Sequence, residues 1–282
     1  MAKKWENWTF GELDATLSNI HEIADNKRTA FQSRLKNFHR LRFPLYFKSE
    51  KGRTSFYTAE QVVQMALAIE LTQLGLPPER TALVLTLNWF PAMMAMRLAA
   101  QELQKHPGGF DYDKLYARED NPDSIFLFFD PAALSTLMLG DNPAHSPDID
   151  ITARSFFYGS AKVVAENIVG WTAVDKARIS LINMTKLIDD LVSEPRHRNT
   201  RASFFAQIAD WSDAYEAERG DWCAEEHVFD FLECFKIGSP DQTEDEALAE
   251  LARNLHIKLE IVRRCWTSYL ESEERRANVR SS

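Results

Sequence analysis

Apolar residues recur at helical spacing through the first third of the chain, and capping residues mark where the helices begin. Thr9 and Glu12 form a capping box, in which each side chain satisfies a backbone N–H at a helix start, and they open a predicted helix through 12–24. A second helix is predicted over 29–41. Pro44 stops it, because a proline ring cannot continue a helix.

Two further helices follow at once. Thr58 and Gln61 form another capping box, the apolar residues after them keep a helical period, and Gly75 suits the end of that helix. The two prolines at 77–78 open the next helix, since proline is favoured at a first helical position.

Residues 45–57 separate the second helix from the third. They combine aromatic and β-branched residues around Gly52, which predicts a two-stranded ribbon. The order helix, helix, ribbon, helix, helix is that of a winged helix-turn-helix.

The middle of the chain has a different pattern. The apolar run 124–130 predicts a buried strand, followed by a helix over 130–140 and a loop over 142–148. Residues 151–171 are interpreted as a β-hairpin that turns at Gly159–Ser160, and Asp175 as the cap of an amphipathic helix over 176–192. Together they predict a small β-α-β-β-α unit.

The last 80 residues look helical and acidic, after a polar, basic linker at 193–201. Within them, 248–264 has the apolar spacing of a helix-turn-helix, with His256 at the turn position that glycine usually occupies. Either this is a second DNA-reading element, or it is an amphipathic helix pair used for self-association.

The predicted fold class is therefore mainly α with a small α+β middle. We expect three domains: a winged helix-turn-helix over 1–106, an α/β dimerisation or sensing unit over 107–193, and a helical C-terminal region over 200–282.

Charge is distributed very unevenly. The chain has a net charge of −9, yet 27–53 contains nine basic residues and only one acid, Glu50. This segment carries +8, which leaves −17 for the rest of the chain. A solvated helix face is one explanation. A surface for the phosphate backbone of a nucleic acid explains the separation better, because it supplies an anionic partner.

Several classes of protein are disfavoured. Cys223, Cys234 and Cys265 are odd in number and widely spaced, which argues against a disulfide framework or a metal knuckle and favours a reducing cytoplasm. No apolar run approaches the roughly 18 residues of a membrane span. Phosphate-binding glycine loops and paired histidines are missing from the sequence, so we expect neither an enzyme nor a cofactor.

Three stretches resemble the mercury-resistance-regulator (MerR) family of transcription factors. They are TFGEL at 9–13, RLKNF at 34–38, and 52–85, where Gly52 and Arg53 match the wing. The resemblance implies a recognition helix in the major groove and a wing arginine against the DNA backbone. It also implies RNA polymerase as a partner.

These considerations give one set of candidate DNA-binding residues: Lys27, Arg28, Arg34, Lys36, Arg40, Arg42, Lys51, Arg53 and Tyr57. The basic side chains suit phosphates and base edges. For Tyr57, as for Phe38, a place in the core is the alternative to DNA contact.

We therefore expect a cytoplasmic regulator that binds double-stranded DNA sequence-specifically and forms a homodimer. Two alternatives stay open. One is an architectural DNA-binding protein of a phage or mobile element, such as an excisionase or packaging adaptor. The other is a ligand-binding or catalytic α/β domain that carries an N-terminal interaction module.

Overall fold

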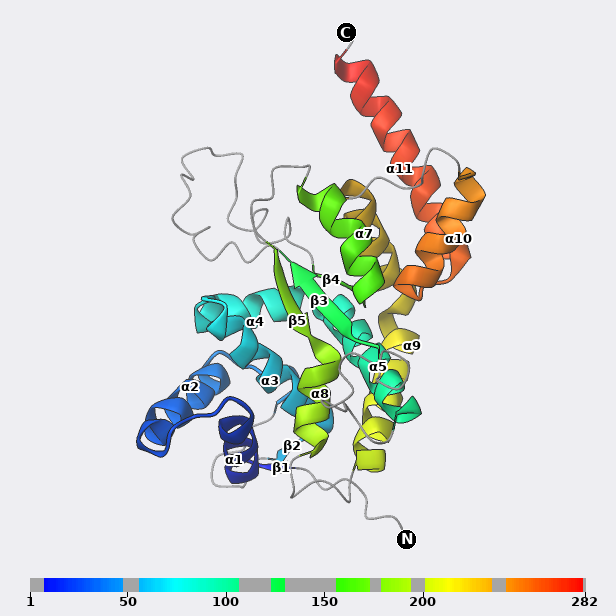
Figure 1. Cartoon of the computed structure of the whole chain (residues 1–282). Helices are drawn as coiled ribbons and strands as arrows, with labels where there is room; N and C mark the ends of the chain where they lie inside the picture. The colour runs from blue at the N-terminus through cyan, green and yellow to red at the C-terminus, as the bar shows by residue number, and fades with distance from the viewer. Residues whose placement is uncertain are drawn as a thin grey trace.

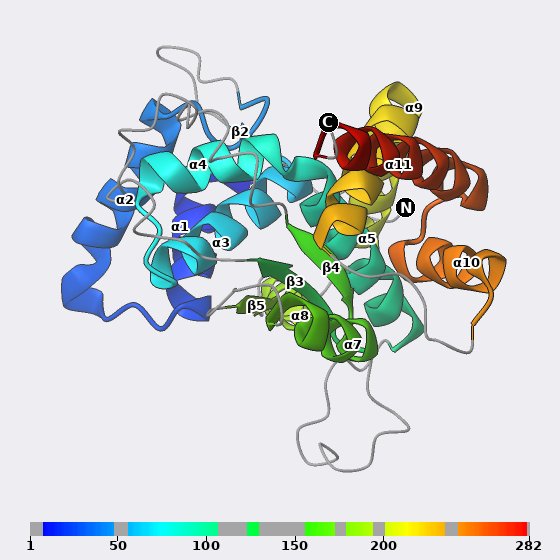
Figure 2. The same cartoon turned by 90° about the horizontal axis from the view of Figure 1, so that it is seen from above.

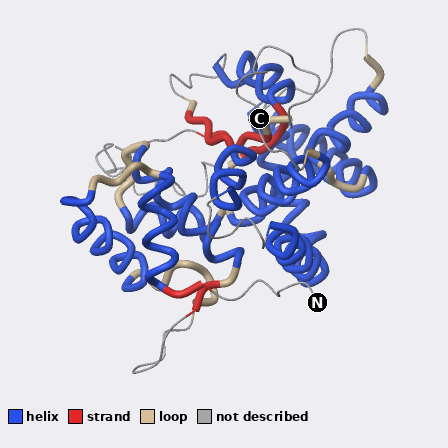
Figure 3. The backbone as a smooth tube through the Cα atoms, turned by 60° about the horizontal axis from the view of Figure 1, so that its bottom comes forward, coloured by secondary structure: helices blue, strands red, loops and turns tan. Residues whose placement is uncertain are grey.

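The structure is a computed structural model that describes residues 8–47, 56–106, 123–129, 156–172, 179–193, 201–234 and 242–280. It is mainly helical, with two small antiparallel sheets that lie apart (Figure 3). The N-terminal elements are β1 (Trp8–Thr9), α1 (Phe10–Ile20), the 3₁₀ turn η1 (Asp25–Lys27), α2 (Arg28–Arg40), β2 (Phe56–Tyr57), α3 (Ala59–Gln73), α4 (Pro78–Leu87) and α5 (Trp89–Lys105). The others are β3 (Ile125–Phe129), β4 (Phe157–Ser160), α7 (Ala161–Thr172), β5 (Ser180–Asn183), α8 (Met184–Ser193), α9 (Arg201–Cys234), α10 (Glu244–Leu255) and α11 (Leu259–Arg280).

The four predicted N-terminal helices are confirmed. Both capping boxes form: the hydroxyl of Thr9 accepts from the N–H of Glu12, and that of Thr58 from the N–H of Gln61. α3 ends before Gly75, whose φ of 94° is one that glycine adopts without a steric penalty. Helix starts and stops are predictable here because caps and prolines act within a few residues of themselves.

The predicted ribbon lies only partly within the described residues. Residues 48–55, with Gly52, lie outside them, whereas 45–47 form a turn and not a strand. The strand that follows, β2, pairs with β1, and Trp8 faces Tyr57 in the register. Tyr46 has φ 59°, which turns the chain out of the extended conformation that a strand needs.

The predicted buried strand is confirmed as β3, the centre of a sheet ordered β4-β3-β5. The predicted hairpin at 151–171 is wrong, because β4 runs directly into helix α7. Gly159 lies within β4 and is no turn residue: a Cβ there would come within 2.5 Å of Val163 Cγ1. The glycine is thus needed for the close approach of α7 to the strand.

The helix predicted over 176–192 is also partly wrong. Its residues 180–183 are strand β5, which pairs with β3 so that Ile182 faces Leu127. Helix α8 begins only at Met184, where the side chain of Asn183 accepts from the N–H of Lys186 at 2.9 Å. Asp175, the helix over 130–140, the loop at 142–148 and most of the linker, 194–200, lie outside the described residues.

Helix α5 is the centre of the molecule. It contacts α8 and α9 as well as strands β3 and β4 (Figure 2). The buried residues of the N-terminal, middle and C-terminal segments join in one hydrophobic core. Helix α5 ends at Lys105 and α8 at Ser193, close to the predicted domain ends at 106 and 193, and the division into three domains stays a prediction.

Candidate nucleic-acid interface

Helix α2 has one buried face and one polar face. Phe31, Leu35 and Phe38 are buried against the core. A period of 3.6 residues then places Thr29, Ser33, Lys36 and Arg40 on the opposite side, and all four are exposed. In both Figure 1 and Figure 2, α2 lies at one edge of the molecule, with α10 and α11 at the other.

The cations of this region differ from the others in their partners. Outside 27–47, most basic side chains on the described surface pair with acids: Arg97, Lys105, Lys162, Lys186, Arg201, Lys258, Arg263 and Arg264. Within 27–47, five candidates form no ion pair with any described residue: Lys27, Arg34, Lys36, Arg40 and Arg42. All five are exposed. Their positive charge is therefore available to an external anion.

Arg28 is the exception among the described basic candidates. Its guanidinium donates to Asp14 Oδ2 at 2.9 Å, and Gln32 Nε2 donates to the same oxygen at 2.9 Å. Asp14 is buried on α1. Arg28 therefore joins α2 to α1, and the prediction that it contacts DNA is not supported by this geometry.

Tyr57 is also a core residue and not a surface contact. Its side chain is 1% exposed, and its hydroxyl lies 2.8 Å from His39 Nε2 on α2. Burial lowers the pKa of His39 to about 4, so this imidazole is neutral at pH 7 and adds no charge to the basic face. The alternative that placed Tyr57 in the core is the one that the structure supports.

An aromatic stack brings the two ends of the basic segment 48–55 together. The ring of Phe47, just before the segment, stacks on Tyr57, just after it, with 4.8 Å between ring centres. Phe47 also stacks on His39 at 4.8 Å. Lys51 and Arg53 lie outside the described residues. The residues that flank the segment on its two sides, Phe47 and Tyr57, both lie beside His39 at the C-terminal end of α2.

The turn between α2 and this stack is held by two glutamines of α3. Gln64 Oε1 accepts from the N–H of Leu45 at 2.6 Å, and Gln61 Nε2 donates to the carbonyl of Leu45 at 3.1 Å. Both glutamines are buried. This role is not visible in the sequence, because their partner lies 16 and 19 residues away along the chain.

One more contact positions a candidate residue. The ammonium of Lys36 lies over the ring of Phe10, 5.6 Å from its centre. This cation–π contact brings Lys36 close to the N-terminal end of α1 without neutralising its charge.

The C-terminal helix pair forms as predicted, with His256 at its turn in the left-handed conformation (φ 52°). Three of its cations are already paired, however: Lys258 with Asp221, Arg263 with Asp245, and Arg264 with Glu225. The paired acids neutralise the positive charges that a DNA contact would need. A second DNA-reading element here stays a prediction, and it has less support than α2.

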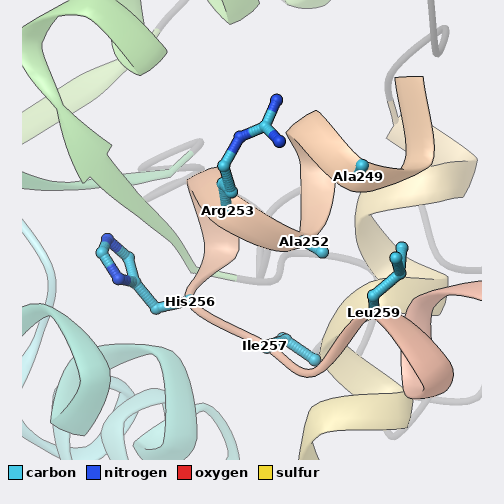
Figure 4. A pocket seen from close by; sticks show the side chains of 6 residues that line it. All are labelled: Ala249, Ala252, Arg253, His256, Ile257 and Leu259. Carbon is cyan, nitrogen blue, oxygen red and sulfur yellow. The ribbon is translucent and has the colours of Figure 1, made fainter. Parts of the chain in front are cut away.

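An open pocket of about 620 Å³ lies beside this turn. Arg253 and His256 project to one side of the turn, and the apolar side chains of Ala252, Ile257 and Leu259 lie toward the other (Figure 4). Burial, together with Arg97 and Lys105 on α5, lowers the pKa of His256.

The described part of the chain holds no group of three or more His, Cys, Asp or Glu side chains that could bind a metal ion. None of its helices is by itself long and apolar enough to cross a membrane; only α4 and α5 taken together pass that test, and they meet at 80°.

Comparison with known proteins gives no further assignment. No protein-family model, curated protein or solved structure matches the chain. The resemblance to the MerR family therefore stays a prediction from the sequence.

Proposed function

We propose that this chain is a sequence-specific regulator of transcription that places α2 in the major groove of double-stranded DNA. The observation that carries the proposal is the set of exposed cations on and beside α2 that pair with no described acid. In an acidic chain where the other described cations mostly have acidic partners, such a set is best explained by an anionic ligand.

The positions of these cations suggest which of them contact base edges and which contact phosphates. Lys36 and Arg40 lie on the outward face of α2, which would meet base edges in the groove, and arginine suits the paired acceptors of guanine. Arg34 and Lys27 lie toward the flank and the N-terminal end of the helix, where phosphates pass. We expect Lys51 and Arg53 to add phosphate contacts from the segment that begins and ends at the Phe47–Tyr57 stack.

Selection of duplexes from a random library by the full-length protein tests this proposal. The expected result is an enriched motif, with affinity that falls steeply as salt is raised because each neutralised phosphate releases counterions. Genome-wide occupancy of a tagged copy would then show whether the sites lie at promoters. Failure to bind any duplex at physiological salt would overturn the proposal.

We also propose that the protein acts as a homodimer, so that two copies of α2 meet two half-sites. The supporting feature is β5, an edge strand of the described sheet whose Leu181 is 43% exposed. An exposed apolar side chain on an outer strand of the described sheet suits a second copy of the same surface.

Light scattering on the full chain checks the oligomeric state. We expect twice the 32.4 kDa of one chain, and a monomer for Leu181→Lys. Leu270→Lys is the matched control, because Leu270 is 41% exposed on α11 and lies away from the sheet edge. A wild-type monomer at micromolar concentration, or a dimer that Leu181→Lys leaves intact, would contradict this placement of the interface.

A further inference from the structure

Tyr46 combines two unusual properties. Its side chain is 66% exposed, the highest value among the large hydrophobic residues of the described surface. Its backbone has φ 59°, in the left-handed region, which side chains with a Cβ rarely adopt. A bulky residue in this conformation is unfavourable for folding, and such outliers concentrate at functional sites.

The neighbours of Tyr46 fix its place. Leu45 is held at both its N–H and its carbonyl by Gln64 and Gln61, and Phe47 is held in the stack with His39 and Tyr57. The aromatic ring between these two anchors therefore leaves the protein from a rigid base. The backbone at Tyr46 therefore needs little further ordering when a partner binds.

Two exposed arginines precede Tyr46 closely in the sequence. Arg42, four residues earlier, is exposed and pairs with no described acid, and it too has a left-handed backbone (φ 60°). Arg40 ends the outward face of α2. An exposed aromatic ring beside such cations, at the end of a candidate recognition helix, suits a nucleic acid better than a protein surface.

We propose that Tyr46 is an aromatic wedge that enters a base step of the bound duplex beside α2 and kinks the DNA. This inference rests on the proposed function and deepens it. Insertion of a side chain between base pairs costs stacking energy. The additional protein contacts that the bent duplex makes offset this cost. Pyrimidine–purine steps unstack most easily, so the duplex that fits best carries one at this position.

The test compares DNA bending by the full-length protein and its variants. End-to-end energy transfer is measured on the selected duplex, of about 30 base pairs, and a 2-aminopurine at the candidate step reports unstacking. We expect the wild type and Tyr46→Phe to bend the duplex and brighten the probe, since stacking needs the ring and not the hydroxyl. Tyr46→Ala is expected to leave the duplex straight and the probe dark, with affinity about tenfold lower.

Two variants separate this effect from unfolding and from removal of exposed apolar surface in general. Tyr46→Gly suits the left-handed backbone, so its melting temperature should equal or exceed that of the wild type while the duplex stays straight. Leu270→Ala removes an exposed apolar side chain far along α11 and should bend DNA normally.

The outcomes distinguish the two proposals. If the wild type binds its duplex but leaves it straight, or if Tyr46→Ala bends it as the wild type does, the wedge is wrong and DNA recognition by α2 stands. If the wild type binds no duplex, the proposed function fails and the wedge fails with it.

Discussion

Replacing Arg34, Lys36 and Arg40 together by alanine is expected to weaken binding to the selected duplex by at least about a hundredfold. A side chain that contacts a base edge contributes about 1–3 kcal/mol, and a factor of ten corresponds to about 1.4 kcal/mol. The slope of log affinity against log salt should also become shallower, by about 0.9 for each phosphate that the variant no longer neutralises. Fluorescence anisotropy at several salt concentrations measures both quantities.

The C-terminal helix pair supplies a control of equal charge change. Lys258, Arg263 and Arg264 can be replaced by alanine together, and all three are paired with acids. They lie in or directly before α11, which is across the molecule from α2 (Figure 1). This second triple variant should bind DNA nearly as the wild type does. Equal weakening in the two triple variants would mean either that only overall charge matters or that the C-terminal helix pair also contacts DNA, and would contradict recognition by α2 alone. The melting temperature of the α2 variant should fall only slightly, because its three side chains are exposed and form no ion pair with a described residue, and the substitutions remove only the cation–π contact of Lys36 with Phe10.

A second large effect is expected in the pH dependence of stability, through Glu60. This carboxyl lies in the first turn of α3, is buried, and accepts from Gln64 Nε2 at 3.0 Å. Burial raises its pKa from 4.5 to about 8. Because the folded state favours the protonated acid, the stabilisation is fully present below about pH 4.5 and is lost as the pH rises toward 8.

Glu60→Gln removes this titration and keeps the shape of the side chain. Each unit of pKa shift corresponds to about 1.4 kcal/mol, so the variant should gain up to about 4 kcal/mol of unfolding free energy over the wild type between pH 5 and pH 8. This is an upper bound, since a helix N-terminus favours a carboxylate. Urea unfolding at several pH values measures the difference. Glu79→Gln makes the same substitution at an exposed first-turn acid on α4 and is the control for the change of residue type. A difference for Glu60→Gln that stays constant with pH would contradict its raised pKa.

The sequence predicts those parts of the fold that local chemistry decides. Capping residues and prolines act within one turn of the chain, so the predicted starts of α1 to α4 are nearly correct, whereas α1 ends at Ile20 and not at residue 24. The errors lie where contacts between residues distant in the sequence determine the local structure. Ser180–Asn183 continues a helical pattern in the sequence, but it becomes a strand because β3 offers an edge. Gly159 has the character of a turn residue in the sequence, and only the approach of Val163 gives its actual role.

The candidate site divides in the same way. An excess of basic residues is visible in the sequence, but their partners are not. Only its contact with Asp14, fourteen residues earlier, distinguishes Arg28 from the other cations. Tyr46 is not predictable as a site residue, because nothing in its neighbours' identities indicates its left-handed backbone or the contacts of Leu45 with Gln61 and Gln64 of α3.

The stack of Phe47 on Tyr57 has a consequence for how such a protein could diversify. It joins the two ends of the 48–55 segment through side chains that belong to the rigid scaffold. The segment between them can then lengthen or shorten without moving α2 or α3, and doubling the length of a closed loop costs only about 0.6 kcal/mol. If α2 binds DNA as proposed, insertions and deletions in these few residues could change the reach along the duplex while α2 stays in place.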